Sequence, residues 1–360
     1  MKIRAFLPIL FLFVCFSTAQ GQKTILIEKL TNAYCGACPN GSIVLDTLRA
    51  GHPNAILVKH HKPIDFDDNP LTNDMSGALW NDINVPGNPA AMIDRKIYNG
   101  DLIVYSGGWS NALTQTAATE NEGEVRIEDL KYDSNTRMLN FTVKATLTEI
   151  STPGPFRLTA MVVEDNVWGQ EQYSYFNNVP GHPLEGLGDI IWAYPHRDVV
   201  RDILEDHWGV ADIIDDTPDP SVEYEYSFSY EIPESYKPDR MSLVATINQH
   251  GSTLSERKVL NATQVFLKNM GLGLTSSTDD LQQEAMVKIY PNPVRNQLQA
   301  EFSSIPEALF IYDSIGELIW TGKAESKYLL VDQLSLENGS YFLTAIVNGK
   351  KKVVPFIVLN

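Results

Sequence analysis

Two patterns of apolar and polar positions divide the chain. Between residues 24 and 118, short apolar runs alternate with stretches in which apolar residues recur every three or four positions. The runs are typical of strands, and the wider spacing is typical of amphipathic helices. Strands are expected at Thr24–Leu30, Ala55–His60, Ala90–Ile93 and Lys96–Tyr98, and helices at Ser42–Ala50, Leu71–Leu79 and Trp109–Ala118. This alternation predicts an α/β unit over residues 24–118.

From about Gly123 the apolar period changes to two. Residues 139–147 (LNFTVKATL) alternate apolar and polar positions, which places the apolar side chains on one face of a strand. Similar segments recur at 125–130, 158–162, 224–230, 243–247 and 259–266. Short strands separated by turn signals predict an all-β unit, an antiparallel Ig-like β-sandwich over residues 123–268.

A long insert at residues 166–220 interrupts the predicted sandwich. It is rich in Asp, Pro and Gly, which favour turns. Loops are expected there, with one short helix around Asp198–Glu205. Residues 269–285 have the composition of a linker, and a third, β-rich segment follows at 286–360.

The first 21 residues have the pattern of a secretory signal peptide. Basic residues precede the apolar run Ala5–Phe16, and small residues follow up to Gly21. The run is too short for a membrane-spanning helix, which needs about 20 apolar residues. Its removal leaves Cys35 and Cys38 as the only cysteines, and an oxidising compartment favours a disulfide between them.

The net charge and the absence of several catalytic motifs argue against some classes of function. The formal charge is −17 and the isoelectric point is near 4.8, which argues against nucleic acid and anionic membranes as partners. The chain has no Gly-rich phosphate loop, Gly-x-Ser-x-Gly elbow or His-Glu-x-x-His motif. Nucleotide hydrolysis, serine hydrolase and zincin functions therefore lack support, and no cofactor or metal is expected.

The motif that carries chemistry is Cys35-Gly36-Ala37-Cys38, between a predicted strand and a predicted helix. A cysteine at a helix N-terminus is favoured as thiolate, because unpaired N–H groups and the helix dipole stabilise negative charge. Such a thiolate attacks a disulfide, and a second cysteine one turn later resolves the mixed disulfide. Cys35 is the expected attacking thiol and Cys38 the resolving thiol.

Two other interpretations of this motif stay open. The pair is also compatible with a static structural disulfide. It is further compatible with half of a zinc site completed by His60 and His61. Zinc needs four ligands, and adjacent histidines on a strand point to opposite faces, so the pattern fits zinc less well.

A second landmark makes the motif resemble the thioredoxin family. In that family a cis-proline precedes a core strand and packs against the redox disulfide, and Pro89 in Val85-Pro86-Gly87-Asn88-Pro89 matches its place. The resemblance implies that Pro89 shapes a substrate groove. It also implies that the backbone of Asn88 meets the substrate and that Tyr34 flanks the exposed sulfur.

One position departs from the thioredoxin pattern. The family keeps a buried acid six residues before the first cysteine, and this chain has Lys29 there. The nearest acid is Glu28, one residue further back. Proton transfer from the resolving Cys38 is therefore the least supported part of the redox interpretation.

Residues 24–268 together resemble an outer-membrane-protein-28-like family, whose members join a thioredoxin-like domain to a β-sandwich. The resemblance rests on these segments: Leu26-Ile27-Glu28 to Thr31, Tyr34-Cys35, Cys38-Pro39, Pro89 to Arg95 and His196 to Arg201. It implies a location more than an activity.

The C-terminal segment resembles the sorting domain of type IX secretion cargo. Its ordered motifs are YPNP at 290–293, IYDSIG at 311–316, NGSY at 338–341 and KKK at 350–352. The resemblance implies that the type IX machinery is a partner and that the domain, a small β-sandwich, is removed. It also implies a secreted, outer-membrane or cell-surface location, reached by release or by attachment to surface lipopolysaccharide.

Two further clusters lie in the insert. The acidic residues Asp212, Asp215, Asp216 and Asp219 suit calcium by ligand type, but a solvated acidic loop fits their spacing better. His182, His196 and His207 accompany Trp168, Trp192 and Trp208. They are candidates for a pocket or a metal site, although lone residues of these types more often serve packing.

The sequence leaves two functions open. The first is a secreted, surface-associated protein that performs thiol–disulfide exchange on extracytoplasmic proteins through Cys35, Cys38 and Pro89. The second is a non-enzymatic surface or binding protein whose thioredoxin-like unit is a scaffold with a structural disulfide. Whether the protein is an enzyme therefore depends on whether the cysteine pair turns over.

Overall fold

The computed structural model describes residues 23–62, 71–148, 154–192, 194–269, 287–290, 292–295, 297–302, 304–313, 317–332, 336–347 and 350–359. The predicted signal peptide lies outside these residues, and so does the predicted linker except for its first residue.

The described residues form three α-helices, α1 (Cys38–Ala50), α2 (Asp74–Ile83) and α3 (Trp109–Ala117). The strands up to the linker are β1 (Ile25–Thr31), β2 (Ala55–His61), β3 (Ala90–Ile93), β4 (Val104–Tyr105), β5 (Gly123–Asp133), β6 (Met138–Leu147), β7 (Phe156–Glu164), β8 (Gln172–Tyr173), β9 (Ile190–Ile191), β10 (Val199–Ile203), β11 (Tyr224–Glu231), β12 (Met241–Gln249) and β13 (Val259–Phe266). Three 3₁₀ turns lie at Pro238–Arg240, Leu254–Glu256 and Leu267–Asn269. The fold is mostly β with few helices.

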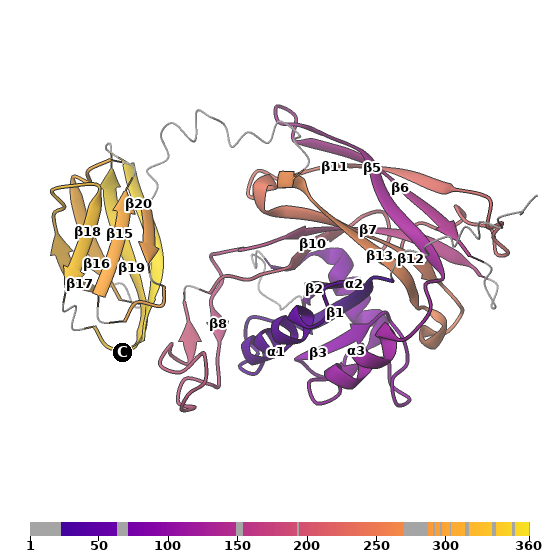
Figure 1. Ribbon diagram of the computed structural model, residues 1–360, viewed down its shortest axis with the longest axis horizontal. Coiled ribbons are helices and arrows are strands. Elements are labelled where there is room, and N and C mark those ends of the chain that lie inside the picture. Colours follow the sequence, from indigo (N-terminus) through magenta and orange to yellow (C-terminus); the bar gives the residue numbers. More distant parts are fainter. Residues whose placement is uncertain are drawn as a thin grey trace, which may run out of the picture.

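One eight-stranded sheet runs through both of the first two predicted units, in the order β13-β12-β7-β10-β2-β1-β3-β4 (Figure 1). Strands β1 and β2 are parallel, and β3 runs antiparallel to β1. Strand β10 links the two halves, because Val199 pairs with Lys59 of β2 and the Lys59 amide donates to the Asp198 carbonyl at 2.7 Å. Strands of the α/β unit and of the sandwich therefore share one hydrogen-bonded layer.

The second layer of the sandwich is the sheet β11-β6-β5. Its inward side chains, such as Phe141 and Phe228, pack against the apolar face of β7, β12 and β13. The alternation predicted over 139–147 is confirmed, since Leu139, Val143 and Leu147 are buried. This core fixes the outer half of the long sheet.

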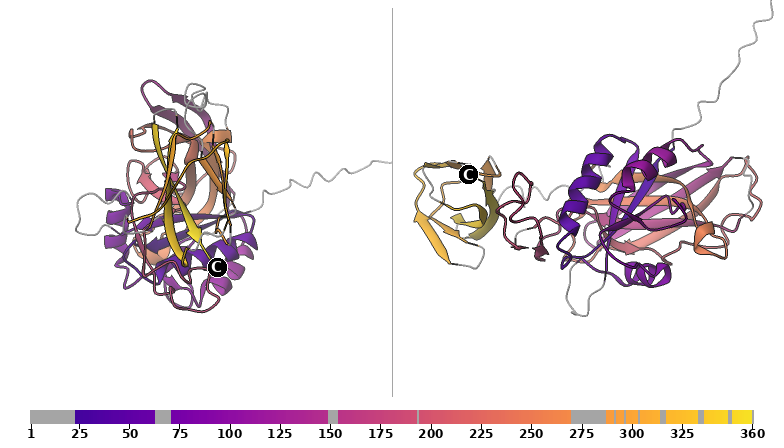
Figure 2. Two further views of the ribbon diagram at one scale, coloured as in Figure 1. Left: turned by 90° about the vertical axis from the view of Figure 1, so that its left-hand side faces the viewer. Right: turned by 90° about the horizontal axis from the view of Figure 1, so that it is seen from below.

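The helices cover both faces of the other half of the sheet. Helices α1 and α3 lie over the face that contains Ile25 and Ile27, and α2 covers the opposite face near Leu30. The right-hand view of Figure 2 shows helices on both sides of the sheet. No helix in the described part of the chain combines the length and apolarity that a membrane span requires.

Two expected elements are wrong. The segment predicted as a helix at Asp198–Glu205 forms strand β10. Its apolar residues do not alternate, because a bulge between Val200 and Asp202 breaks the period and the strand is buried on both faces. The expected strand Lys96–Tyr98 follows a turn with positive φ at Arg95 and forms only a single bridge.

Helix starts also differ from the pattern. Helix α1 begins at Cys38 rather than Ser42, since Pro39 is tolerated in a first turn. Helix α2 begins after Asn73, whose side chain accepts a hydrogen bond from the Ser76 amide as an N-cap.

The C-terminal segment forms two sheets, β14-β15-β18 and β17-β16-β19-β20. The strands are β14 (Val287–Tyr290), β15 (Gln297–Phe302), β16 (Ala308–Tyr312), β17 (Leu318–Gly322), β18 (Tyr328–Asp332), β19 (Gly339–Val347) and β20 (Lys350–Val358). They enclose a separate apolar core. Ile357 and Leu359 also pack against Leu184, Leu187 and Ile191 of the insert.

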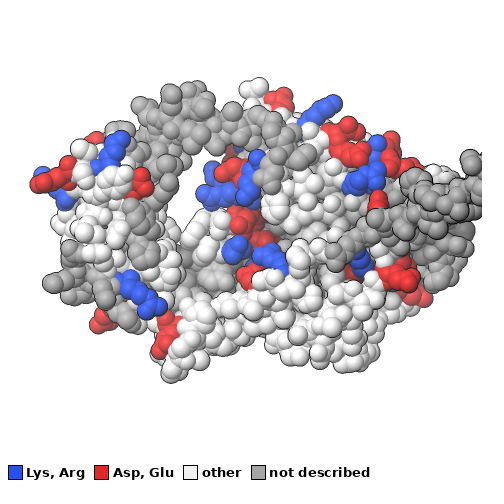
Figure 3. Space-filling view, viewed as in Figure 1, with Lys and Arg blue, Asp and Glu red and all other residues white. Residues whose placement is uncertain are grey.

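Charged side chains of both signs lie beside one another on the face shown in Figure 3. Over sheet β11-β6-β5, Arg126 and Lys144 lie within ion-pair distance of a set of carboxylates: Glu124, Glu128, Glu223 and Glu225. Exposed pairs of this kind add little stability each. They neutralise part of the acidic surplus locally.

Candidate functional site

The site forms where β1 ends and α1 begins. Cys35 and Cys38 are joined by a disulfide, which confirms the predicted pair. The two cysteines differ in access: Cys35 is half-buried, whereas Cys38 is 1% exposed. Only Cys35 is therefore placed to meet a partner from solvent.

The start of α1 favours negative charge at this position. The first turn contains no acidic residue, and Ala37 provides no side-chain cap. The Cys38 amide donates to the Cys35 carbonyl at 3.0 Å, and Pro39 has no N–H, so the helix dipole rather than a set of free amides favours a thiolate here. The pair has the electrostatic setting that a reactive cysteine requires.

Asn88 and Pro89 lie directly against the disulfide. The Cys35 Sγ is 3.5 Å from the Asn88 carbonyl oxygen, and Asn88 Nδ2 donates to Cys38 Sγ at 3.3 Å. The Asn88–Pro89 peptide bond is cis. Gly41 of α1 makes this approach feasible, because a Cβ there would lie 2.8 Å from the Pro89 ring.

Tyr34 stands at the rim of the site. Its side chain is 36% exposed, and its ring centroid lies 5.2 Å from that of Tyr173. The structure thus brings Cys35, Cys38, Asn88 and Pro89 together, with Tyr34 beside them.

A segment that the sequence analysis did not predict covers the motif. Strand β8 comes from the insert, and its Tyr173 amide donates to the Ala33 carbonyl at 2.8 Å. Gln172 Nε2 donates to the carbonyls of Ala33 and Cys35 at 2.8 and 3.2 Å. The Tyr175 amide donates to the Gly36 carbonyl at 2.9 Å. A separation of about 140 residues carries no local pattern, so sequence reasoning missed these contacts.

Gly36 is the one residue of the motif whose type indicates that another segment packs closely against it. A Cβ at Gly36 would collide with the ring of Tyr175. The absence of a side chain at this position therefore lets the insert lie flat on the motif. His182 adds a second anchor, with Nε2 placed 2.9 Å from Asn40 Oδ1 of α1.

Lys29 lies under the start of α1. The side chain is fully buried, and Nζ donates to the Cys38 carbonyl at 2.8 Å and to Ser42 Oγ at 2.6 Å. Burial, together with the charge of Lys59, holds the pKa of Lys29 well below its usual range. The position that departs from the thioredoxin pattern is thus in contact with the resolving cysteine.

A group of polar side chains from β2 and the insert continues behind Lys29. Tyr194, which hydrogen-bonds to Ser42, has its pKa raised by burial to about 12. Burial lowers the pKa of His196 to about 3 and that of His61 well below its usual range. The His61 and His196 rings meet edge to face at 5.5 Å. These histidines are held neutral in the interior.

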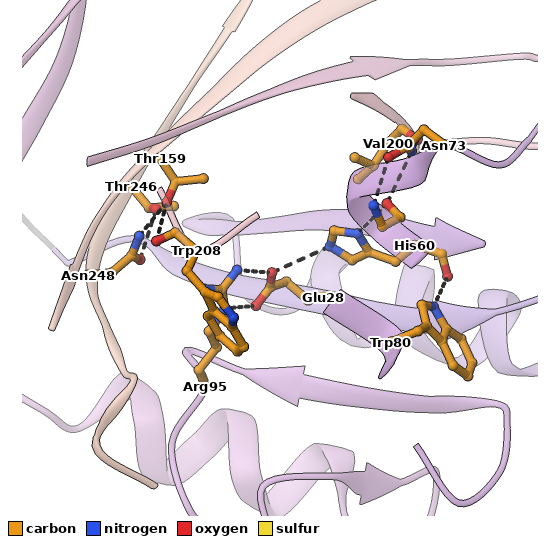
Figure 4. Close-up of polar contacts among 11 residues, drawn as sticks. Glu28, His60, Asn73, Trp80, Arg95, Thr159, Val200, Trp208, Thr246 and Asn248 are labelled. Carbon is orange, nitrogen blue, oxygen red and sulfur yellow. Dashed lines mark hydrogen bonds and ion pairs between the residues drawn. The ribbon is translucent and has the colours of Figure 1, made fainter. Parts of the chain in front are cut away.

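The opposite face of β1 holds a different network (Figure 4). Arg95 donates to both carboxylate oxygens of Glu28 at 2.7 Å, and His60 Nε2 lies 3.4 Å from Glu28 Oε1. Burial by itself would raise the pKa of Glu28, but Arg95 and His60 lower it to about 2. Arg95 also stacks on Trp208 at 5.0 Å. The acid near the motif is therefore committed to an ion pair away from the cysteines.

The remaining candidates of the insert do not meet in one pocket. His182 contacts α1, His196 contacts β2, and His207 Nε2 lies 2.8 Å from Asp82 Oδ2 of α2. Trp168 and Trp192 are largely exposed, whereas Trp208 is buried. Asp219 accepts hydrogen bonds from Ser221.

Metal binding at these groups has no geometric support. Within the described residues, no group of three or more His, Cys, Asp and Glu side chains is arranged to hold a metal ion. His60 and His61 point to opposite faces of β2, toward Ser76 and toward His196. The cysteine pair and the two histidines therefore do not converge on one point.

Two family models match the chain. Residues 76–270, more than half of the chain, match the model described as outer membrane protein Omp28. Residues 288–360 match the secretion system C-terminal sorting domain. No curated protein matches the chain.

Solved structures add a likeness of fold. HBP35 of Porphyromonas gingivalis is 19% identical, with a TM-score of 0.54, over 94% of this chain and 98% of that one. A domain of the outer membrane lipoprotein Omp28 from the same organism is 15% identical, with a TM-score of 0.24, over 41% of this chain and 88% of that one. At these identities the likeness to HBP35 concerns the fold alone.

The two family matches confirm the resemblances to the outer-membrane-protein-28-like family and to the sorting domain, and they confirm the location. An outer membrane family and a sorting domain together make this a secreted, outer-membrane, cell-surface protein and a cargo of type IX secretion, whose machinery is a partner through residues 288–360. The chain therefore belongs to the outer membrane protein Omp28 family and carries a C-terminal secretion sorting domain.

Proposed function

We propose that this surface protein performs thiol–disulfide exchange on extracytoplasmic proteins, with residues 24–118 acting as a thioredoxin-like unit. Cys35 attacks, Cys38 resolves, and Pro89 with Asn88 forms the surface that an extended substrate meets. Tyr34 contributes to the rim of that surface.

The observation that carries the proposal is the unequal access of the two sulfurs. Cys35 is half-buried and lies against the Asn88 carbonyl, whereas Cys38, the first residue of α1, is buried. Exchange needs one sulfur that a substrate can reach and one that attacks from within. The position at a helix start also favours the thiolate of Cys35.

The reaction balances as a two-electron exchange. In the reduced protein, the Cys35 thiolate attacks a substrate disulfide and forms a mixed disulfide, while one substrate thiolate leaves. The Cys38 thiolate then attacks Cys35 Sγ and releases the second substrate thiolate. The substrate disulfide is reduced, the cysteine pair is oxidised, and the reverse sequence oxidises a substrate dithiol.

The first test is the reactivity of Cys35. We expect a Cys35 thiol pKa below the ordinary value of about 8.5 and reduction of insulin by the reduced protein. A Cys38→Ser variant should trap mixed disulfides on intact cells, and the matched Cys35→Ser variant should trap none. An ordinary thiol pKa without exchange would refute the proposal.

The alternative is a scaffold with a structural disulfide, and one observation favours it. The backbone around the motif is held by β8 and Tyr175 through the carbonyls of Ala33, Cys35 and Gly36. A loop fixed in this way suits a static bond. Under the alternative, Cys35→Ser would destabilise the fold and leave every exchange readout unchanged.

The domain division belongs to the same proposal. Residues 123–268 serve as a sandwich that supports the site, and residues 286–360 serve as an export signal that is removed on release or on attachment to surface lipopolysaccharide. Deletion of Val287–Asn360 should retain the protein in the periplasm. Unchanged surface display of the deletion variant would contradict this assignment.

A further inference from the structure

A buried amine lies directly behind the resolving cysteine. Lys29 Nζ is 2.8 Å from the carbonyl oxygen of Cys38, and Lys29 and Cys38 are 0% and 1% exposed. Ser42 Oγ, at 2.6 Å, fixes the amine from the next turn of α1. The amine therefore lies against the backbone of Cys38, and both side chains are excluded from solvent.

The amine has no counter-ion of its own. Among the described residues, no carboxylate lies within 4.0 Å of Lys29 Nζ, although other buried lysines have such partners. Transfer of an unpaired ammonium into the interior is strongly unfavourable. The neutral amine, a proton acceptor, is the form that burial favours.

We propose that Lys29 and Cys38 share one proton in the reduced protein, and that the Lys29 amine accepts the Cys38 thiol proton when the mixed disulfide is resolved. This inference rests on the proposed thiol–disulfide exchange. It assigns to Lys29 the role of proton acceptor for Cys38, because no acid occupies this position in the chain.

The step conserves atoms, electrons and charge. The Cys38 S–H bond breaks and an N–H bond forms on Lys29, which converts a thiol–amine pair into a thiolate–ammonium pair. The thiolate attacks Cys35 Sγ, the mixed disulfide breaks, and the substrate thiolate leaves. The ammonium then returns its proton to the departing thiolate or to solvent.

Several charged and titratable groups face the amine. Lys59 is its register partner on β2 and disfavours the ammonium, whereas Asp46 of α1 and Asp198 before β10 favour it. His61 and His196 lie behind it and interact with its charge. Both acids lie beyond ion-pair distance of the Lys29 amine, so deprotonation of Cys38 adds a negative charge on the residue whose carbonyl the amine already contacts.

A single-turnover reaction with one equivalent of Ellman's reagent separates the two steps, using the reduced protein without residues 1–21 and therefore without Cys15. Attack by Cys35 releases the first coloured thiolate, and resolution by Cys38 releases the second. We expect Lys29→Met to slow the second phase by at least about 100-fold, the usual contribution of a positioned acid or base. The first phase should stay within about twofold of wild type.

The matched control is Lys59→Met, which removes a second buried lysine from the adjacent strand. Lys59 pairs with Asp198 at 3.4 Å, whereas the amine that donates to the Cys38 carbonyl is that of Lys29. We expect both phases of this variant to stay within about threefold of wild type, in contrast to Lys29→Met. Equal slowing by both variants would overturn the proposal, because it would reveal a general charge effect.

The wild-type protein supplies a readout that does not depend on a variant that folds. An ordinary thiol would make the second phase rise about tenfold per pH unit below its pKa of about 8.5. A shared proton instead predicts a second phase that is nearly flat between about pH 6 and 8. A tenfold rise per unit would overturn the inference while leaving thiol–disulfide exchange intact. Loss of a fast first phase in wild type would refute the exchange itself.

Discussion

Glu28 and Lys29 are neighbours in β1, are equally buried, and meet opposite surroundings. Glu28 receives two hydrogen bonds and a full positive charge from Arg95, with His60 close by. Lys29 receives no opposite charge within ion-pair distance among the described residues, and its partners are a carbonyl and a hydroxyl. Two consecutive strand residues therefore differ in charge compensation: Glu28 is paired with Arg95, and Lys29 has no ion-pair partner among the described residues.

The difference separates a structural role from a chemical one. A buried, paired carboxylate resists protonation and holds distant segments together, because both partners would be left uncompensated if they separated. A buried amine without a counter-ion is ready to change its protonation state, which makes it suitable for proton transfer.

Arg95→Met should cause the largest loss of stability. It leaves the Glu28 charge buried without its partner, which typically costs about 3–5 kcal/mol. The measurement is urea unfolding at neutral pH followed by near-ultraviolet circular dichroism. The double variant Glu28→Gln, Arg95→Met should recover most of the loss, and a single-variant loss below about 1 kcal/mol would contradict the assignment.

Lowering the pH should remove the contribution of Glu28 to the free energy of unfolding, between about pH 5 and pH 2. Its pKa is lowered from 4.5 to about 2 in the folded protein, so the unfolded chain takes up a proton first as the pH falls. The stabilisation is complete above about pH 5 and is lost as the pH falls toward 2, by up to a few kcal/mol. The stability difference between wild type and Glu28→Gln should shrink over this range. A constant difference would refute the prediction.

The contribution of Lys29 to stability should instead rise with pH in the alkaline range. The pKa of the folded-state amine is depressed, so the unfolded chain holds an extra proton up to its ordinary pKa, and wild type gains stability as the pH rises toward 10. A single proton limits this slope to about 1.4 kcal/mol per pH unit. Lys29→Met should lack the slope, which the difference between the two stability profiles from pH 7 to 10 measures. Parallel profiles would show that the amine stays charged when folded.

Two serines offer the smallest and most closely matched test. Ser42 contacts Lys29, and Ser76 contacts His60 on the opposite face at 2.9 Å. Each Ser→Ala variant removes a hydroxyl with two partners, Lys29 and Tyr194 for Ser42 and His60 and Asn73 for Ser76, and should lose about 1–2 kcal/mol of stability. Only Ser42→Ala should also slow the second phase with Ellman's reagent, by a few-fold. An equal kinetic effect of Ser76→Ala would remove the distinction between the two faces.

The helices and most strands could be predicted because their signals are local. Periodicity located α1, α2, α3 and the alternating strands of the sandwich, and the ordered C-terminal motifs identified the sorting domain. Strand β10 was mistaken for a helix because a bulge breaks its period. Its place between β2 and β7, which joins two predicted units in one sheet, depends on pairing between distant segments.

The candidate site was predictable only in part for the same reason. Spacing placed Cys35 with Cys38, and the thioredoxin resemblance added Asn88 and Pro89. The cover formed by Gln172, Tyr173 and Tyr175 carries no local pattern. Gly36 indicates that another segment packs closely against the motif, but it does not identify that segment.

The sequence alone predicted that Cys35 and Cys38 pair ahead of a helix, that residues 286–360 form a sorting domain, and that Glu28 and Lys29 face opposite sides of a strand. Period two guarantees the last point, since successive side chains of a strand alternate. The partners of these two side chains depend on the tertiary fold: Glu28 meets Arg95, 67 residues away, while Lys29 meets Cys38 with no carboxylate of the described residues within 4.0 Å. Alternation fixes the direction of a side chain, but the packing of distant segments fixes its partner and therefore its chemistry.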